Sequence, residues 1–163
     1  MTTTPDLSAF GVPPISQIGI VVRDLDAALA FYGPLFGPFT VVGFTNRNFL
    51  FHGRPADCEL RVAYGWSGDI EVELLQPVSG DSPQREALER CREGLHHVQF
   101  RVAEIDPWIT KLEKAGYSRL WEKRSGSFGF VYLESPLQPV VLEFVSPLER
   151  SEINRASGHL VIE

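Results

Sequence analysis

The stretch VVLEFVSP, residues 140–147, places the carboxylate of Glu143 in the middle of a run whose other side chains suit the interior of a strand. A second stretch, IEVELLQP at 70–77, places Glu73 in the same way. In both stretches a proline follows the glutamate four residues later. A carboxylate that is buried without a partner is costly unless it is neutralised or paired. The repeated placement therefore predicts that the two glutamates have a common role.

Both stretches belong to an internal repeat that spans most of the chain. QIGIVVRDLD at 17–26 matches HVQFRVAEID at 97–106 with an offset of 97 − 17 = 80, and the two glutamates match with an offset of 143 − 73 = 70. The apolar periodicity of each copy predicts a strand, a helix and three further strands. In the first copy Asp24 suits a helix N-cap, and Gly33-Pro34 is expected to limit the length of the helix.

A duplicated module that cannot close its own sheet usually pairs with its copy. The repeat therefore predicts an α+β fold, in which two βαβββ modules pair into a cup-shaped mixed β-sheet with the helices on the outside. Between the modules, Ser82 and Pro83 have the order of an N-cap and a first helical position. The predicted division is an N-terminal tail at 1–14, a first module at 15–78, a linker helix at 79–94, a second module at 95–147 and a C-terminal tail at 148–163.

Composition restricts the class of protein. The 163 residues are 44% hydrophobic and 22% charged, and the formal net charge is −6. Lys and Arg do not cluster, which argues against a nucleic acid partner, and no apolar run approaches the roughly 20 residues of a membrane span. MTTTPDLSAFGVPP lacks the features of a signal peptide. The two cysteines, Cys58 and Cys91, lack metal-motif spacing. We expect a soluble, cytoplasmic protein.

Strand side chains alternate between the two faces of a sheet, and this assigns the residues of 95–102. His96 lies on an apolar face that suits packing under a helix. His97 shares the opposite face with Gln99 and Arg101, and this face is too polar for a sealed core. We therefore expect the side of His97 to face the inside of the cup.

The repeat makes Gln17 the equivalent of His97, and Glu73 the equivalent of Glu143. If the modules face each other, these four side chains converge. A lone glutamate in a strand usually faces solvent, and a lone histidine is usually a hydrogen-bonded core residue. Four such residues at equivalent positions instead favour a divalent metal between the carboxylates. One nitrogen and three oxygens suit Zn²⁺, Ni²⁺, Co²⁺, Mn²⁺ or Fe²⁺.

At these residues the chain resembles the vicinal oxygen chelate superfamily, over about 15–147. QIGIVVRDLDAALAFYGPLFG resembles the opening strand and helix of that family. IEVELLQPVSGDSPQREALERCREGLHHVQFRV resembles its methylmalonyl-CoA epimerase and glyoxalase-like branch. By position, the resemblance implies the metal ligands Gln17, Glu73, His97 and Glu143.

The ligand set departs from the epimerase pattern, which usually has His at the position of Gln17 and often Gln at that of Glu73. The set Gln, Glu, His, Glu is similar to that of eukaryotic-type glyoxalase I. Epimerases also supply an extra carboxylate from the strand before Glu73, and both Glu59 and Arg61 are near its expected position. An arginine there would leave two-base epimerisation without its second base.

The resemblance implies that two adjacent substrate oxygens chelate the metal and that a proton next to a carbonyl is abstracted through a metal-stabilised enolate. Glu143 is the expected base, Glu73 is expected to return the proton, and Gln17 and His97 are expected to be ligands only. The implied activity is that of an isomerase, epimerase or lyase acting on a small oxygen-rich molecule. The resemblance also implies a homodimer.

The remaining candidates are residues that would contact the substrate. Arg61 and Arg101 could hold an anionic group, or pair with Glu59 or Glu71 in a structural role. Aromatic residues exceed the needs of a core, and some are expected to line an apolar pocket. The predicted substrate-binding set is Arg61, Gln99, Arg101, Phe130 and Tyr132.

Two other functions remain open. A non-catalytic protein that sequesters a small molecule, similar to the antibiotic-sequestering members of the superfamily, would use the cup without the four metal ligands. An iron-dependent ring-cleaving dioxygenase would need two histidines and one glutamate, and only His97 occupies a ligand position.

Overall fold

The structure is a computed structural model that describes residues 11–147 and 158–163. The predicted tails at 1–14 and 148–163 lie in part outside the described residues. The elements in chain order are β1 (Ile15–Val21), α1 (Leu25–Phe36), β2 (Thr40–Phe51), β3 (Arg54–Ser67), β4 (Ile70–Gly80), α2 (Pro83–Glu89), β5 (Gly94–Arg101), α3 (Asp106–Lys114), β6 (Ser118–Ser125), β7 (Phe128–Glu134), β8 (Val141–Ser146) and β9 (Gly158–Ile162). The order β-α-β-β-β thus occurs twice, with α2 between the copies, and the division into modules is an interpretation of this order.

Local sequence explains where the helices begin. The Asp24 carboxylate accepts a hydrogen bond from the backbone N–H of Ala27, and the Ser82 hydroxyl accepts one from the N–H of Arg85. Each side chain thereby satisfies a donor that the first helical turn leaves unpaired. α1 does not stop at Gly33-Pro34 as predicted, but continues to Phe36. Pro34 has no backbone N–H and so cannot donate a helical hydrogen bond. The helix nevertheless continues, and the Gly37 N–H donates to the Gly33 carbonyl at 2.9 Å.

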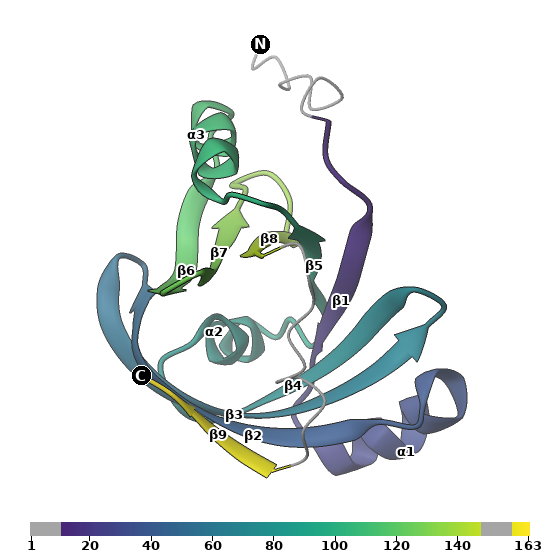
Figure 1. Ribbon diagram of the computed structural model, residues 1–163. Coiled ribbons are helices and arrows are strands. Elements are labelled where there is room, and N and C mark those ends of the chain that lie inside the picture. Colours follow the sequence, from purple (N-terminus) through teal and green to yellow (C-terminus); the bar gives the residue numbers. More distant parts are fainter. Residues whose placement is uncertain (1–10, 148–157) are drawn as a thin grey trace.

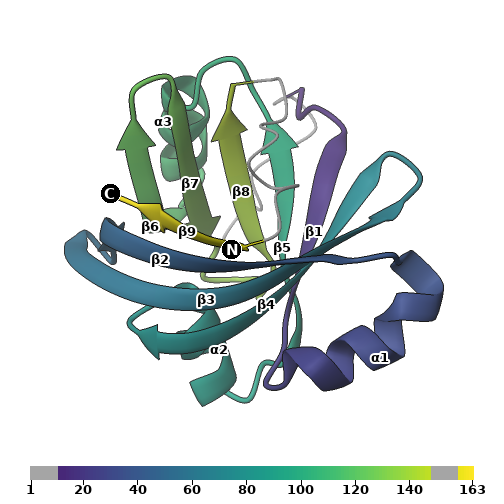
Figure 2. The same cartoon turned by 60° about the horizontal axis from the view of Figure 1, so that its bottom comes forward.

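The strands form one mixed sheet that closes on itself. Its order is β3-β4-β1-β5-β8-β7-β6-β2-β9, and a further β3–β2 pairing joins the ends of the eight-stranded part. β1 pairs with β4, β5 with β8 and β2 with β9 in parallel, and the other neighbours are antiparallel. The views in Figures 1 and 2 show strands around a central space, with α1 and α3 outside the sheet and α2 at one end. The predicted cup of paired βαβββ modules is confirmed.

The core has an inner part and two outer parts. One cluster lines the inside of the sheet and includes Phe49, Trp121 and Tyr132. A second cluster packs α3 against β5, β7 and β8, and a third packs α1 against β1, β3 and β4. Phe100 and Val102 lie under α3, as the alternation predicts. Both helices therefore hold the strands from outside, which leaves the inner face for a cavity.

The two modules meet along two seams of different extent. At the first seam β1 and β5 pair along almost their whole length, from Ile15–Phe100 to Val21–Gly94. At the second seam β2 and β6 pair at two positions only, Leu50–Glu122 and Phe51–Trp121. The remaining edge of β2 is paired with β9. The polar residues predicted to converge lie at the first seam.

Candidate metal and substrate site

The four predicted ligands come together within a single chain. The His97 Nε2 lies 3.3 Å from an oxygen of Glu73, 3.3 Å from an oxygen of Glu143 and 3.2 Å from the amide oxygen of Gln17. β4 and β8, the strands that carry the two glutamates, flank β1 and β5 on opposite sides. The His97 ring is fully buried, and the exposed fractions of the other three residues are 8% or less. The convergence that the repeat predicts is therefore observed.

Gly19 allows the His97 ring to occupy this position. Gly19 lies directly opposite His97 in the pairing of β1 with β5, and a bulge follows it. A Cβ atom at Gly19 would overlap three atoms of the imidazole ring. Glycine within a strand often marks the close approach of another group to the backbone. Here the group is the ring at the centre of the site.

Amide and carboxylate groups around the four residues fix their orientation. The Nε2 of Gln17 donates to Glu71 at 2.7 Å, which turns the amide oxygen of Gln17 toward His97. The Nε2 of Gln99 lies 3.1 Å from the Gln17 oxygen and 3.0 Å from a Glu143 oxygen, and Ser16 donates to the Gln99 side chain. Such surrounding partners hold metal ligands in place in proteins generally.

Burial strongly affects the two glutamates. It raises the pKa of Glu73 to about 8, to which the neighbouring Glu71 contributes, whereas a hydrogen bond from the Tyr64 hydroxyl opposes the shift. Burial also raises the pKa of Glu143 to about 7, against the opposing effects of His97 and the Gln99 amide. Both carboxyl groups therefore favour the neutral form unless a positive charge lies between them.

The adjacent histidines are both buried, and both rings pack against Tyr132. A register shift in the β1–β5 pairing leaves His96 as an extra residue between the partners of Gly19 and Ile20, so the alternation that predicted His96 under a helix does not hold at this position. Burial lowers the pKa of His97 and, with the proximity of His97, lowers the pKa of His96 to about 3. The Nδ1 atoms of the two rings are 3.3 Å apart. His96 also lines a second cavity, of about 460 Å³, between α2 and β8. Both imidazoles are neutral at neutral pH, the form in which His97 can donate a lone pair to a metal.

The chemistry of the donor set, one imidazole nitrogen and three side-chain oxygens, suits a divalent metal. Among the described residues, no group of three or more His, Cys, Asp or Glu side chains is arranged as a metal site, and the donors contact one another instead. With metal–ligand bonds of about 2.0–2.2 Å, neighbouring donors on one ion stand roughly 3.0–3.5 Å apart. The His97 nitrogen already lies within that range of three oxygens. The residues that would hold the ion are Gln17, Glu73, His97 and Glu143.

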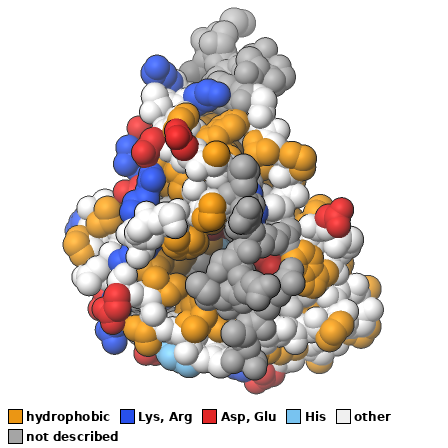
Figure 3. All heavy atoms as spheres, viewed as in Figure 1, with side chains coloured by type: hydrophobic (Ala, Val, Ile, Leu, Met, Phe, Trp, Pro, Cys, Tyr) orange, Lys and Arg blue, Asp and Glu red, His pale blue; other side chains and the backbone are white. Residues whose placement is uncertain are grey.

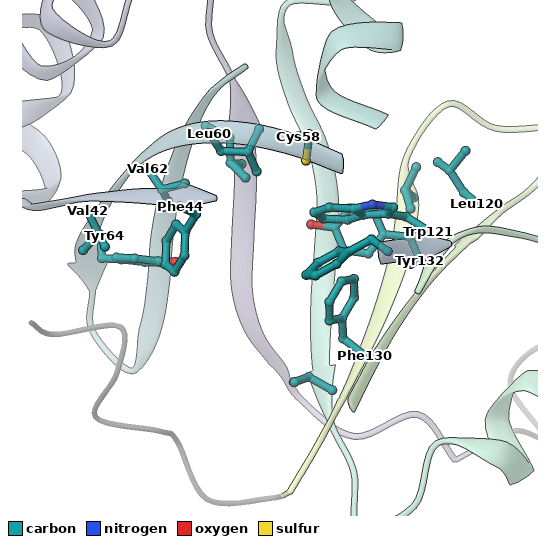
Figure 4. Packing of buried hydrophobic residues seen from close by; sticks show 14 residues of the cluster. Val42, Phe44, Cys58, Leu60, Val62, Tyr64, Leu120, Trp121, Phe130 and Tyr132 are labelled. Carbon is teal, nitrogen blue, oxygen red and sulfur yellow. The ribbon is translucent and has the colours of Figure 1, made fainter. Parts of the chain in front are cut away.

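A cavity of about 130 Å³ opens onto three of these residues, Gln17, Glu73 and Glu143. Its polar end is formed by Gln17, Glu73, Gln99 and Glu143, and its walls are mainly aromatic and aliphatic. Figure 4 shows Trp121, Phe130 and Tyr132 on one side, and Phe44 and Val62 on the other. On the face seen in Figure 3, hydrophobic side chains gather around a hollow. The cavity thus combines an oxygen-rich end with an apolar body.

Four of the five predicted substrate-binding residues line this cavity, namely Gln99, Arg101, Phe130 and Tyr132. Arg61 does not. Because Leu60 and Val62 of β3 face the cavity, Arg61 points to the other face, where it pairs with Asp26 of α1 at 3.1 Å. Glu59 also lies on that face and accepts a hydrogen bond from Ser79. The predicted cup-side placement of Arg61 is therefore wrong, and neither residue supplies a cavity group from β3.

Three contributors to the site were not identified from the sequence as such. Gly19 provides space, Glu71 orients Gln17, and Tyr64 donates to Glu73. The sequence signal for Gly19 is a glycine inside an otherwise apolar strand. For Glu71 it is a second glutamate two residues before Glu73, on the same face of β4. Tyr64 lies opposite Glu73 in the β3–β4 pairing, which requires knowledge of the register.

Comparison with known proteins assigns the chain to a family. Residues 16–132 match the model of the glyoxalase/bleomycin resistance protein/dioxygenase superfamily. The chain belongs to this superfamily. A protein of Bacillus subtilis (strain 168), YqjC, is 30% identical over 86 residues, which are 53% of this chain and 55% of that protein. The chain thus matches about half the length of this curated relative.

Solved structures of the superfamily share the fold. A methylmalonyl-CoA epimerase from Mycobacterium tuberculosis has a TM-score of 0.61 at 20% identity, with 89% of this chain and 93% of that chain covered. A variant epimerase from Streptomyces coelicolor in complex with 2-nitronate-propionyl-CoA has a TM-score of 0.58 at 24% identity, with 85% and 100% covered. The hypothetical protein BH1468 from Bacillus halodurans C-125 has a TM-score of 0.59 at 22% identity, with 85% and 97% covered. Within the described residues of this superfamily member, no helix has the length and apolar character needed to cross a membrane.

Proposed function

We propose that this superfamily member is a divalent-metal-dependent isomerase, epimerase or lyase that abstracts a proton next to a carbonyl of a small oxygen-rich substrate. The observation that carries the proposal is the symmetric placement of Glu73 and Glu143 around His97, each at 3.3 Å, at the buried end of a cavity. Two carboxyl groups with raised pKa values are an unfavourable arrangement for a core, but a suitable one for a cation and for proton transfer.

The two glutamates are suited to hold and move a proton. Glu143 faces the cavity, and its pKa of about 7 allows it to accept and release a proton near neutral pH. Glu73 faces the same cavity from the opposite strand and would return the proton from the other side. The Gln99 amide holds Glu143, and the Tyr64 hydroxyl holds Glu73. A divalent ion bound beside them supplies Lewis-acid stabilisation of negative charge on a substrate oxygen.

The second catalytic group of the proposal is Glu73 and not a residue of β3. Glu59 and Arg61 lie on the face away from the cavity, so neither can exchange a proton with a molecule inside. Epimerisation would then use Glu143 and Glu73 on two sides of one carbon. A glyoxalase-type reaction would use the same pair to move a proton between neighbouring carbons. Acyl-CoA thioesters, which epimerase neighbours bind, are one substrate class to screen.

The alternative is a binding protein that sequesters a small apolar molecule. It is favoured by the aromatic walls, in particular Trp121, Phe130 and Tyr132. Such a protein would retain its ligand unchanged and would not need a cation. Metal content and proton exchange therefore separate the two functions.

The first experiment measures metal by plasma mass spectrometry in untagged, dialysed protein. We expect near-stoichiometric metal in the wild type and its loss in Glu143→Ala. The matched control is Glu104→Ala, which removes the same group from an exposed position and should retain the metal. Absence of metal from the wild type, even after incubation with Zn²⁺, Ni²⁺, Co²⁺ and Mn²⁺, would rule out the enzyme as proposed.

The second experiment follows proton abstraction directly. Candidate carbonyl substrates are incubated with the protein in D₂O, and loss of the proton next to the carbonyl is followed by NMR. We expect exchange with the wild type and with Glu104→Ala but not with Glu143→Ala. Bound but unexchanged substrate would favour the sequestering protein. The proposal includes a homodimer, which light scattering on a sizing column would test.

A further inference from the structure

The C-terminal strand completes the wall of the cavity. The backbones of β2 and β6 pair only at Leu50 and Phe51, so the edge of β2 before these residues is free of β6. β9 pairs in parallel with the free edge of β2 over five positions, from Val42 to Asn46. Figure 2 shows β9 running along β2. The free edge of β2 at the second seam is therefore covered by a segment outside the repeat.

Three features hold β9 in this position. The His159 Nε2 lies 2.7 Å from the Thr45 hydroxyl. Gly43 lies opposite His159, and a Cβ atom there would stand 2.6 Å from the His159 Nδ1, so the glycine makes room for the ring. Leu160 and Ile162 pack against the inner core cluster. A polar contact, a fitted ring and two apolar side chains together define the register of the strand.

Side chains alternate between the two faces of β9, so Val161 and Ile162 lie on opposite faces. Ile162 lines the cavity together with Phe44 and Asn46 of β2. Val161, its neighbour, faces outward with 55% of its surface exposed. Because the two side chains belong to one strand, substitution of either residue should perturb the backbone of β9 to a similar extent. Only substitution of Ile162 should alter the cavity.

The cavity measures about 130 Å³, polar end included, and Ile162 forms part of its wall. Its polar end presents Gln17, Glu73 and Glu143. A molecule that fills both parts carries its oxygens at one end and a compact apolar group at the other.

We propose that β9 limits the size of the apolar group that enters this cavity, with Ile162 as a specificity-determining residue. This size limit rests on β9 alone, whereas the oxygen pair of the probes used below rests on the proposed function. Removal of the Ile162 side chain enlarges the apolar part of the cavity and leaves its polar end unchanged.

The test uses two probes with the same oxygen pair and different apolar groups, phenylglyoxylate and 2-naphthylglyoxylate. Binding is measured by calorimetry, with and without added Zn²⁺. We expect the wild type to prefer the smaller probe by at least about tenfold, because forcing a second ring into a filled space is unfavourable. Ile162→Ala should reduce this preference below about threefold, and deletion of residues 158–163 should reduce it at least as far. Val161→Ala should keep the wild-type preference.

The outcomes separate the two proposals. If Ile162→Ala keeps the tenfold preference, or if neither probe binds the wild type, the size limit set by β9 is overturned. If the preference responds as expected but Zn²⁺ does not strengthen binding, and Glu143→Ala binds like the wild type, then the metal-dependent function fails and the role of β9 stands. Should the deleted chain fail to fold by circular dichroism, Ile162→Ala and Val161→Ala still decide the result.

Discussion

The two seams between the modules each contain a histidine ring packed on a glycine, and the two contacts differ in surroundings. At the first seam His97 covers Gly19 inside the sheet, where the ring is fully buried and touches both glutamates. At the second seam His159 of β9 covers Gly43, and the ring is exposed. In both cases the glycine lies opposite the histidine in the strand pairing.

The difference shows that the same contact, a histidine ring packed on a glycine of the neighbouring strand, has two different roles. At Gly19 the missing side chain places a potential ligand, and the ring has no space to move because every neighbour is packed. At Gly43 the missing side chain lets a terminal strand dock, and the ring can turn toward solvent. Substitution of Gly19 should therefore affect metal content and stability more strongly than substitution of Gly43.

The largest effect is expected for Gly19→Ala. The new methyl group overlaps the His97 ring, and displacement of the ring in a packed interior costs on the order of 1–3 kcal/mol or more. We expect loss of bound metal by mass spectrometry and a lower urea midpoint. Gly33→Ala is the matched control, because its Cβ would meet no atom within 4 Å, and a helical alanine should be neutral or stabilising. Retention of metal by Gly19→Ala would show that His97 is not a ligand.

An intermediate effect is expected from pH in metal-free protein. Glu73 and Glu143 have folded-state pKa values of about 8 and about 7, above the ordinary value of 4.5. A raised carboxyl pKa stabilises the fold at low pH, and this stability is lost as pH rises through the folded pKa. Between pH 6.5 and 8.5 we expect the free energy of unfolding to fall by on the order of 2 kcal/mol. The lowered pKa of His97 acts at lower pH, where it removes stability as pH falls.

Urea unfolding of protein dialysed against a chelator measures this dependence. Glu73→Gln removes one of the titrating groups and should weaken the dependence of the free energy of unfolding on pH. Saturation with Zn²⁺ should also weaken it, because the carboxylates are then already deprotonated. Gly43→Ala, at the other seam, should keep the wild-type slope. If the free energy of unfolding depends as steeply on pH in Glu73→Gln as in the wild type, other groups cause the pH dependence.

The smallest effect is expected for Gly43→Ala itself. The exposed His159 ring can move aside and loses its contact with Thr45, a change worth about 1 kcal/mol. We expect faster hydrogen exchange of the β9 amides, with metal content and the urea midpoint of the main body nearly unchanged. Loss of metal in this variant would mean that the two seams are coupled, contrary to the comparison above.

The sequence was sufficient to predict the convergence of four polar residues that the structure has at the first seam. The repeat placed Gln17, Glu73, His97 and Glu143 at equivalent positions, and period-two alternation assigned them to the inner face, where the structure has them. Their roles as ligands and bases are still predictions. Arg61 was misplaced because the apolar pattern of β3 does not reveal which of its faces meets β7 across the cavity.

The second seam could not be predicted from the same signals. β9 has no equivalent in the repeat, and it pairs with the edge of β2 that the other strands of the first module leave free, at positions far away in the sequence. β2 and β3 are also joined only by a short turn at His52 and Gly53, which adopt positive φ angles of 49° and 75°. The alternation of apolar and polar residues along a strand does not indicate which distant strand it pairs with.

The separation in sequence of the four converging residues has a consequence for biosynthesis. Gln17 and Glu143 are 143 − 17 = 126 positions apart, and β8 is the last strand of the second module. A chain emerging from the ribosome therefore carries Glu73 and His97 without their last partner until most of the protein has been made. Folding that relies on such distant contacts is slow. Premature termination before β8 would leave an incomplete set of donors, so retention of a metal ion would report that synthesis has passed this strand.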